Sequence, residues 1–258
     1  MPGKEIKTVS FIGSGNVACA LGYRFRLAGF TIRGCHNPHR KHAASFIQLT
    51  GSQWLSFEQI IQEQNLLIVA IPDDALPAVC EKIKTTALVL HTSGPTHINL
   101  LQHAAKGYGV LYPFQSITVH SAKYSNEVIP FYIEGNNIST QRKIYKIAKQ
   151  LSDQVYRLNS EKRLHLHLTA VISQNFSNHL LHIAELLLKK EKLKFSALLP
   201  LLSSYCNKLK HHKPSTLQTG PAIRGDKKIM AKHLALLKEH KEWEKIYRML
   251  SRDIIRIK

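Results

Sequence analysis

The segment that decides the fold is IKTVSFIGSGNVACALGYRFRLAG, which occupies residues 6–29. Residues 6–12 are mostly β-branched or apolar, which predicts a buried β-strand. Residues 16–28 follow as a predicted helix, and Gly29 stands where helices commonly end in a left-handed residue. Only Gly13-Ser14-Gly15 joins the two elements. We therefore expect a strand that passes through a tight turn directly into a helix.

The glycines of this turn fit the pattern GxGxxA, with Ala18 in the third position. In Rossmann domains this pattern binds the pyrophosphate of a dinucleotide. Gly13 can take the tight turn, Gly15 lets the backbone approach a pyrophosphate, and the helix N-terminus attracts its charge. An ordinary glycine-containing turn is the alternative. We expect cofactor contacts from Gly13, Ser14, Gly15, Asn16 and Val17.

Short β-type runs alternate with helical runs as far as residue 159. We expect strands at residues 30–35, 66–71, 87–91, 108–112, 129–134 and 154–158. We expect helices at residues 39–50, 57–64, 96–106 and 139–151, and one that Asp73 or Asp74 caps and that ends near Lys84. The run LLIVAI, at 66–71, is continuously apolar, as in a parallel sheet covered on both faces. The alternation predicts a doubly wound α/β sheet.

The pattern becomes wholly helical after residue 159. A helical run without Gly or Pro covers 161–194, and others cover 195–210, where Pro200 is a kink or break, and 226–257. Residues 211–225 read as a loop. We therefore predict a dinucleotide-binding domain at 1–159 and an all-α domain at 160–258.

The composition is that of a globular protein, with 44% hydrophobic and 21% charged residues among 258. The net charge of +19 is concentrated in the C-terminal part. We interpret it as solvated helix faces, because no nucleic-acid-binding motif accompanies the lysines. No apolar run is long enough to span a bilayer, and no secretory signal is evident. The four cysteines are scattered, which indicates reduced thiols in a cytoplasmic protein.

The end of the predicted second strand bears on the choice between NAD and NADP. It reads GCHNPHRK, at 34–41, and lacks the acid that binds the ribose hydroxyls of NAD. A polar and basic cluster suits a 2′-phosphate, with Asn37 and Arg40 as contacts, or is simply solvated. The spacing of His36, His39 and His42 could suggest a metal ion, but no carboxylate or thiol pattern accompanies it, so we predict none.

Seven motifs together resemble a known group: FIGSGNVA (11–18), IPDDAL (71–76), LHTSG (90–94), YPFQS (112–116), IPFYIEG (129–135), LHLTAVISQNFSNHL (166–180) and QTGPAIRGD (218–226). The chain resembles bacterial Rossmann-like proteins with a C-terminal domain of unknown function. These are relatives of pyrroline-5-carboxylate reductase, the 6-phosphogluconate and β-hydroxyacid dehydrogenases, and deazaflavin-linked NADP reductases. The resemblance implies NADP, with NAD as the alternative, and an all-α, 6-phosphogluconate dehydrogenase-like second domain that forms a homodimer. The Ser-Arg usual in this family after the second strand is His36-Asn37 here.

Three loops should meet where parallel strands end, which is where open α/β sheets bind ligands. We expect Ile71, Pro72 and Asp73 beside the cofactor ribose, and His91, Thr92 and Ser93 near the nicotinamide. Helix capping and loop hydrogen bonds are the structural alternatives. Tyr112 and Gln115, on the third loop, are candidate substrate contacts.

The helical run at 161–194 carries polar side chains on one face. His167, Asn175 and Asn178 could contact a substrate, or could bond neighbouring helices or a dimer partner. The lysine usual in β-hydroxyacid dehydrogenases is absent, since Val171 and Gln174 stand one turn before the two asparagines. We expect His167 to supply the proton, with His91 and Tyr112 as second choices. His182 reads as packing. The loop at 218–226 could cover the cleft, with Gln218 and Arg224 binding an anionic substrate group.

These features favour an NADP-dependent oxidoreductase that transfers hydride to or from a small, carboxylated C=O or C=N substrate. A non-catalytic NADP-binding or sensing protein is the alternative. A nucleic-acid-binding protein that uses the basic helical part would show steeply salt-dependent binding. The sequence offers no basic patch interleaved with aromatic residues to support that third interpretation.

Overall fold

The computed structural model describes residues 6–63, 65–118 and 128–257. The chain divides into two compact units, Met1–Ala170 and Val171–Lys258. The helical part of the chain begins earlier, at α6 (Ser160–Ala170), so this helix belongs to the first unit. The domain division near residue 159 stays a prediction. Within the described residues, every helix is too short or too polar to cross a lipid bilayer.

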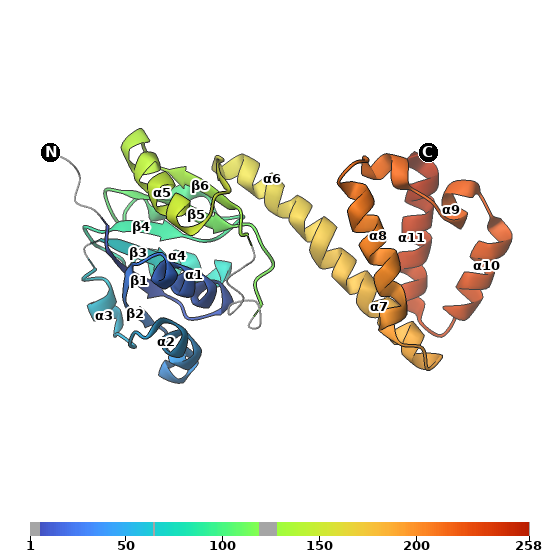
Figure 1. Cartoon of the computed structure of the whole chain (residues 1–258), viewed down its shortest axis with the longest axis horizontal. Coiled ribbons are helices and arrows are strands. Elements are labelled where there is room, and N and C mark those ends of the chain that lie inside the picture. Colours follow the sequence, from blue (N-terminus) through green and yellow to red (C-terminus); the bar gives the residue numbers. More distant parts are fainter. Residues whose placement is uncertain (1–5, 64, 119–127, 258) are drawn as a thin grey trace. The chain divides into compact units, whose positions relative to one another are not determined.

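The first unit is built on a seven-stranded sheet with strand order β2-β1-β3-β4-β5-β6-β7 (Figure 1). All neighbouring strands are parallel except β5 and β6, which pair antiparallel. This arrangement confirms the predicted Rossmann-type α/β fold with a helical C-terminal part. The strands are β1 (Thr8–Ile12), β2 (Thr31–His36), β3 (Leu66–Val69), β4 (Leu88–His91), β5 (Tyr108–Pro113), β6 (Phe131–Gly135) and β7 (Val155–Arg157).

Strand β3 is apolar throughout because a hydrophobic core lies on each face of the sheet. Leu66 and Ile68 of β3 point into one core, and Leu67 and Val69 point into the other. The first core holds α1 (Asn16–Leu27), α2 (Ala44–Thr50) and α5 (Ile138–Leu151), and the second holds α3 (Phe57–Ile60) and α4 (Leu76–Cys80). A strand buried on both faces cannot show polar alternation, as the sequence indicated.

Three predicted helices are shorter than expected, and the one expected at 57–64 ends at Ile60. The one expected to run to Lys84 is a 3-10 turn (Asp73–Ala75) followed by α4, and Pro72, not an aspartate, stands at its N-cap position. The one expected at 96–106 is a single 3-10 turn, Ile98–Leu101. At its start, side chains bond two first-turn amides, which a helix leaves without an internal partner: Ser93 Oγ accepts from the Thr96 amide, and Ser160 Oγ accepts from the Ile98 amide.

The second unit contains helices only, among residues 171–257. A π-helical segment, Val171–Phe176, precedes α7 (Ser177–Lys190), and the others are α8 (Leu199–Leu209), α9 (Pro221–Arg224), α10 (Lys227–Leu236) and α11 (Lys241–Ile257). Pro200 lies in the first turn of α8, where proline is tolerated, so it is not a kink. The predicted loop at 211–225 is wrong, because it contains a 3-10 turn (Pro214–Leu217) and α9. Asp226 caps α10.

Candidate functional site

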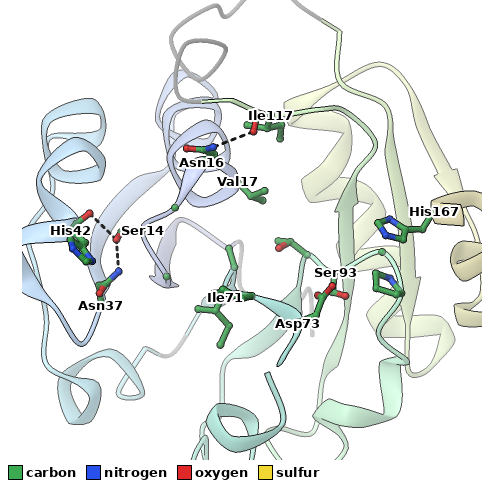
Figure 2. A pocket seen from close by; sticks show the side chains of 17 residues that line it. Ser14, Asn16, Val17, Asn37, His42, Ile71, Asp73, Ser93, Ile117 and His167 are labelled. Atoms are coloured by element: carbon green, nitrogen blue, oxygen red, sulfur yellow. Dashed lines mark hydrogen bonds between the residues drawn. The ribbon is translucent and has the colours of Figure 1, made fainter. Parts of the chain in front are cut away.

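A cavity of about 690 Å³ opens where the parallel strands end. Its walls are the segments that follow β1, β2, β3, β4 and β5, together with one side chain of α6. Figure 2 shows Ser14, Asn37 and His42 gathered at one side of the cavity and Asp73, Ser93 and His167 at the other. The lining residues are Gly13, Ser14, Gly15, Asn16, Val17, Asn37, His42, Ala70, Ile71, Pro72, Asp73, Thr92, Ser93, Gly94, Pro95, Ile117 and His167.

The turn after β1 can be built only with glycine at position 13. Gly13 has φ +106°, and a Cβ on it would lie 2.0 Å from the Ala70 carbonyl oxygen. Its amide donates to the His36 carbonyl at 2.8 Å, which ties the turn to β2. Gly15 differs, since a Cβ there would meet nothing within 4 Å. The backbone at Gly15 is therefore open to the cavity, where a ligand can approach it closely.

Helix α1 begins at this opening and presents an uncompensated N-terminus. Gly15 is its N-cap and has no side chain to cap it, and the first turn contains no acidic residue. The first backbone bond of the helix runs from the Cys19 amide to the Gly15 carbonyl, 2.9 Å. The amides of Asn16, Val17 and Ala18 therefore have no acceptor inside the helix. Three such N–H groups and the helix dipole together attract an anion.

The side of the cavity near β2 is held by short polar bonds. Asn37 Nδ2 donates to Ser14 Oγ at 2.9 Å, and Ser14 Oγ donates to the His42 carbonyl at 3.1 Å. Asn37 Oδ1 accepts from the His39 amide at 2.9 Å. Arg40 does not line the cavity, and its guanidinium lies over the Trp54 ring, 5.6 Å from the centroid. This side of the cavity is thus polar, and the basic Arg40 stands outside its lining.

His42 lines the cavity, although no motif of the sequence predicts a cofactor role for it. The spacing of His36, His39 and His42 is one that a metal site can show. Within the described residues, no three His, Cys, Asp or Glu side chains converge to hold a metal ion. His36 instead bonds the Leu55 carbonyl through Nδ1 at 3.0 Å and packs against Trp54.

His167 lines the opposite side of the cavity and contacts Tyr112, which does not itself line the cavity. The Tyr112 hydroxyl lies 3.2 Å from His167 Nδ1, and this is its one hydrogen-bond partner in the described part of the chain. Burial raises the pKa of the Tyr112 hydroxyl, and the nearby Asp73 carboxylate raises it further against the lowering effect of Arg163. The hydroxyl therefore keeps its proton at neutral pH and is able to donate a hydrogen bond to Nδ1. In that arrangement a neutral His167 ring carries its own proton on Nε2.

Gly94 makes this pairing possible. A Cβ at position 94 would lie 2.7 Å from His167 Nδ1 and 2.9 Å from Tyr112 Cζ. The loop after β4 is thus pressed against both rings. Its glycine lies in the motif LHTSG, which predicts a loop at the ends of the strands but does not predict this contact.

His91, a second predicted catalytic candidate, does not line the cavity. Its side chain is fully buried at the end of β4, and Nδ1 accepts a hydrogen bond from the Ser93 amide at 3.2 Å. Burial, with smaller effects from Arg163 and His97, lowers the pKa of His91 to about 3. The ring is therefore neutral at physiological pH and shapes the loop that carries Thr92 and Ser93.

The remaining candidates lie elsewhere. Gln115 is exposed after β5, and its Oε1 accepts from the Ser116 amide at 3.1 Å. The others belong to the second unit and are exposed within it: Asn175, Asn178, Gln218 and Arg224. Asp226 does not pair with Arg224 but accepts from the Ile229 amide at 3.1 Å, which is the capping alternative for this aspartate.

Two domain families match the chain, one after the other. Residues 4–116 match a Rossmann-like domain, and residues 129–254 match the Domain of unknown function (DUF2520). A solved structure from Bacteroides fragilis, described as a "putative NADP oxidoreductase", is 32% identical, with TM-score 0.88, and the alignment covers 97% of this chain and 98% of that one. The fold and site define a Rossmann-type protein with a helical C-terminal part. The chain belongs to the family that joins the Rossmann-like domain to DUF2520.

More distant structures share the fold. An imine reductase from Myxococcus stipitatus in complex with NADP+ is 13% identical, with TM-score 0.66, over 97% of this chain and 94% of that one. A pyrroline carboxylate reductase from Plasmodium falciparum with NADP bound is 13% identical, with TM-score 0.56, over 98% of this chain and all of that one. At such identity the likeness concerns the fold alone. No curated protein matches the chain.

Proposed function

We propose that the protein is an NADP-dependent oxidoreductase that transfers hydride to or from a small, carboxylated substrate with a C=O or C=N bond. The observation that carries this proposal is one cavity with an anion-binding helix N-terminus at Gly15 and an imidazole, His167, on its opposite side. Its volume lies in the range of cofactor and ligand sites. The description of the 32% identical relative supports the same cofactor. NAD is the alternative.

The residues fit a dinucleotide at the cavity. The open backbone at Gly15 and the amides of Asn16 and Val17 would hold the pyrophosphate, while Gly13 and Ser14 shape the turn. Asn37 and Arg40 are the proposed contacts of a 2′-phosphate, and His42 joins them because it lines the cavity. Bound there, a nicotinamide dinucleotide supplies or accepts hydride. Along the rest of the cavity, the proposed contacts are Ile71, Pro72, Asp73, Thr92 and Ser93.

His167 is the proposed proton donor. With the Tyr112 hydroxyl donating a hydrogen bond to Nδ1, the neutral ring presents Nε2–H to an oxygen or nitrogen that gains electron density. When Nε2 gives up its proton, Nδ1 takes the Tyr112 proton, so the ring stays neutral and Tyr112 is left as the phenolate until solvent returns a proton. Asp73 and Ser93 lie on the same side of the cavity. Asn175, Asn178, His91, Tyr112 and Gln115 remain proposed contributors to catalysis or substrate binding. The exposed Gln218 and Arg224 remain candidates for a substrate carboxylate.

A fluorescence titration with NADPH tests the cofactor assignment. Gly15→Asp places a carboxylate at the helix N-terminus, so we expect the NADPH Kd to rise about 100-fold or more, because two like charges would meet. Gly107→Asp is the matched control: it adds the same charge just before β5, at the other end of the sheet, where a Cβ makes only ordinary contacts. Failure of the wild type to bind NADPH or NADH at submillimolar concentration would refute the proposal.

A turnover assay separates an enzyme from a sensor. NADPH oxidation is followed with a panel of keto acids and cyclic imines, and the best substrate is then tested with His167→Gln. We expect kcat to fall about 100-fold with the NADPH Kd unchanged, because general acid catalysis is lost. NADPH binding without turnover on any member of the panel would favour the non-catalytic alternative, which the residues Val171 and Gln174 at the lysine position support.

We also propose that two copies associate through the C-terminal helices. Large apolar side chains of the second unit are exposed in the single chain, among them Phe176 at 57%, Leu201 at 68% and Met249 at 62%. Such an exposed apolar surface is typical of an interface. The cytoplasm is the proposed compartment, because Cys19, Cys35, Cys80 and Cys206 are all free thiols.

A further inference from the structure

A fully buried arginine, Arg163, lies on α6 one helical turn before His167. Its side chain is 0% exposed. A buried guanidinium is retained only when its donors are satisfied, because an unpaired charge is strongly unfavourable inside a protein. Arg163 does not line the cavity, so it has no direct part in the proposed hydride transfer. Its role must therefore be sought in the groups that it holds.

Four of the five donors of Arg163 are used, and they join three separate segments. Nε donates to the Gly94 carbonyl at 3.0 Å, and Nη2 donates to the Thr96 carbonyl. Nη1 donates to the carboxylate of Glu134 on β6, and Nη2 also donates to Ser160 Oγ at 3.2 Å. The planar guanidinium can hold such a set at fixed angles, whereas a lysine ammonium cannot.

The partners of Arg163 are themselves held. Glu134 accepts from the amide and the hydroxyl of Ser160, at 3.0 and 2.7 Å, so the carboxylate also fixes the start of α6. On the loop, Ser93 Oγ donates to Thr96 Oγ1 at 2.7 Å. The loop after β4 and the first turn of α6 are therefore one bonded assembly with Arg163 at its centre.

This assembly sets the contact between His167 and Tyr112. Arg163 fixes the Gly94 carbonyl, and Gly94 is the residue pressed against both rings. Because Arg163 and His167 are four residues apart on one helix, the same guanidinium also fixes the helix that carries the imidazole. We propose that Arg163 is a positioning residue, which holds His167 against the Tyr112 hydroxyl so that the neutral ring keeps its proton on Nε2. This inference rests on the proposed role of His167 as the proton donor.

The experiment measures the His167 tautomer directly, without a substrate. Long-range proton–nitrogen correlation spectra of 15N-histidine-labelled protein report which ring nitrogen carries the proton, and His167→Gln assigns the signal. We expect the wild type to show Nε2–H. In Arg163→Lys we expect the ratio of Nε2–H to Nδ1–H to fall about fivefold or more, as for the loss of one hydrogen bond. Arg157→Lys is the matched control, because Arg157 is an exposed arginine of β7.

A second variant covers the case in which Arg163→Lys does not fold. Gly94→Ala leaves every buried charge in place, and Gly94 has no positive φ, so the substitution acts only on the two rings. We expect the same change in tautomer ratio. A folded Arg163→Lys protein, or Gly94→Ala, that keeps the wild-type Nε2–H signal would overturn the inference. Lack of NADPH binding by the wild type would instead overturn the proposed function, so the two failures are distinguishable.

Discussion

The two units of the chain bury their apolar side chains to very different degrees. In the first unit, β3 and the first three residues of β4 are wholly buried apolar strands between two cores. Among residues 171–257 of the second unit, only Ile183, Ala222 and Leu237 are buried hydrophobic residues. The first unit therefore has its own hydrophobic core. The second unit leaves exposed the apolar side chains whose burial would have to stabilise it. A helical unit with so little buried area needs a further surface to cover it.

Two glycines with nearly equal φ values, one in each unit, test this difference with the largest expected effect. Gly13, in the first unit, has φ +106°, and Gly220, in the second, has φ +110°. Alanine is strained at both positions by about 1–3 kcal/mol, because L side chains rarely adopt such φ values and Gly220, with ψ 177°, lies in a region populated essentially by glycine. At position 13 it must also displace the Ala70 backbone, whereas at position 220 it meets nothing within 4 Å. We expect Gly13→Ala to lose roughly 3–5 kcal/mol of unfolding free energy, with the clash included.

The measurement is urea unfolding monitored by hydrogen-exchange mass spectrometry, which reports on each unit separately. Gly220→Ala is the matched control, and its loss should be the smaller one, about 1–3 kcal/mol, because only the backbone strain remains. Equal losses for the two variants would mean that the backbone packing around Gly13 adds nothing to the stability of the first unit.

The next prediction concerns the exposed apolar side chains of the second unit. Leu201→Asp on α8 should raise the dimer dissociation constant about 100-fold or more, roughly 2.7 kcal/mol, if this side chain is buried between two copies. Ile138→Asp is the control: Ile138 is 74% exposed, like Leu201 at 68%, but lies in the first unit on α5. Sedimentation equilibrium measures both variants. A dimer that is weakened equally by both, or a wild type that is a monomer, would contradict the proposed interface.

Features that depend on neighbouring residues could be predicted from the sequence, whereas features that depend on distant contacts could not. The turn Gly13–Val17 is predictable because its strand, its glycine pattern and its helix follow one another in the sequence, and all five of its residues line the cavity. The buried strand at 66–69 is predictable because both of its faces are apolar. In contrast, the short turn at 98–101 begins with the Ile98 amide bonded to Ser160, 62 residues away, and no local pattern predicts that contact.

The candidate site was predictable only in part for the same reason. His42 lines the cavity because of the local bend after β2, but its spacing with His36 and His39 suggested a metal ion instead. The contact of Gly94 with His167 and the pairing of Arg163 with Glu134 join distant parts of the chain. No periodicity or motif encodes such pairs, because each requires the sheet to be assembled first.

A third prediction uses the buried histidine of the first unit. The pKa of His91 is about 3 in the folded chain, against 6.5 for an ordinary histidine. Between these values the unfolded chain binds one more proton than the folded chain, so stability rises with pH and is lost as pH falls below about 6.5. Relative to His91→Asn, which removes this titration, we expect the wild type to lose about 2 kcal/mol more between pH 7 and pH 5.

Chemical denaturation at the two pH values measures this difference, and titration of the other histidines cancels between the two proteins. Equal pH dependence of the wild type and His91→Asn would show that His91 is accessible to protons in the folded chain. In that case the loop at His91 would be as open to solvent as the rim of the cavity.

The smallest expected effect lies at the exposed rim of the cavity, in the segment that follows β2. Arg40 is exposed and lies over Trp54, within reach of the basic turn that follows Asn37. If its guanidinium bonds a 2′-phosphate, Arg40→Ala should lower the ratio of the NADH Kd to the NADPH Kd about tenfold, with NADH binding unchanged, because only NADPH carries that group. Arg26→Ala is the matched control, since Arg26 is an exposed arginine over Tyr23 at 5.5 Å on α1. If the ratio is unchanged in Arg40→Ala but reduced in His42→Ala, the phosphate contact belongs to His42 on the cavity wall and not to the stacked arginine.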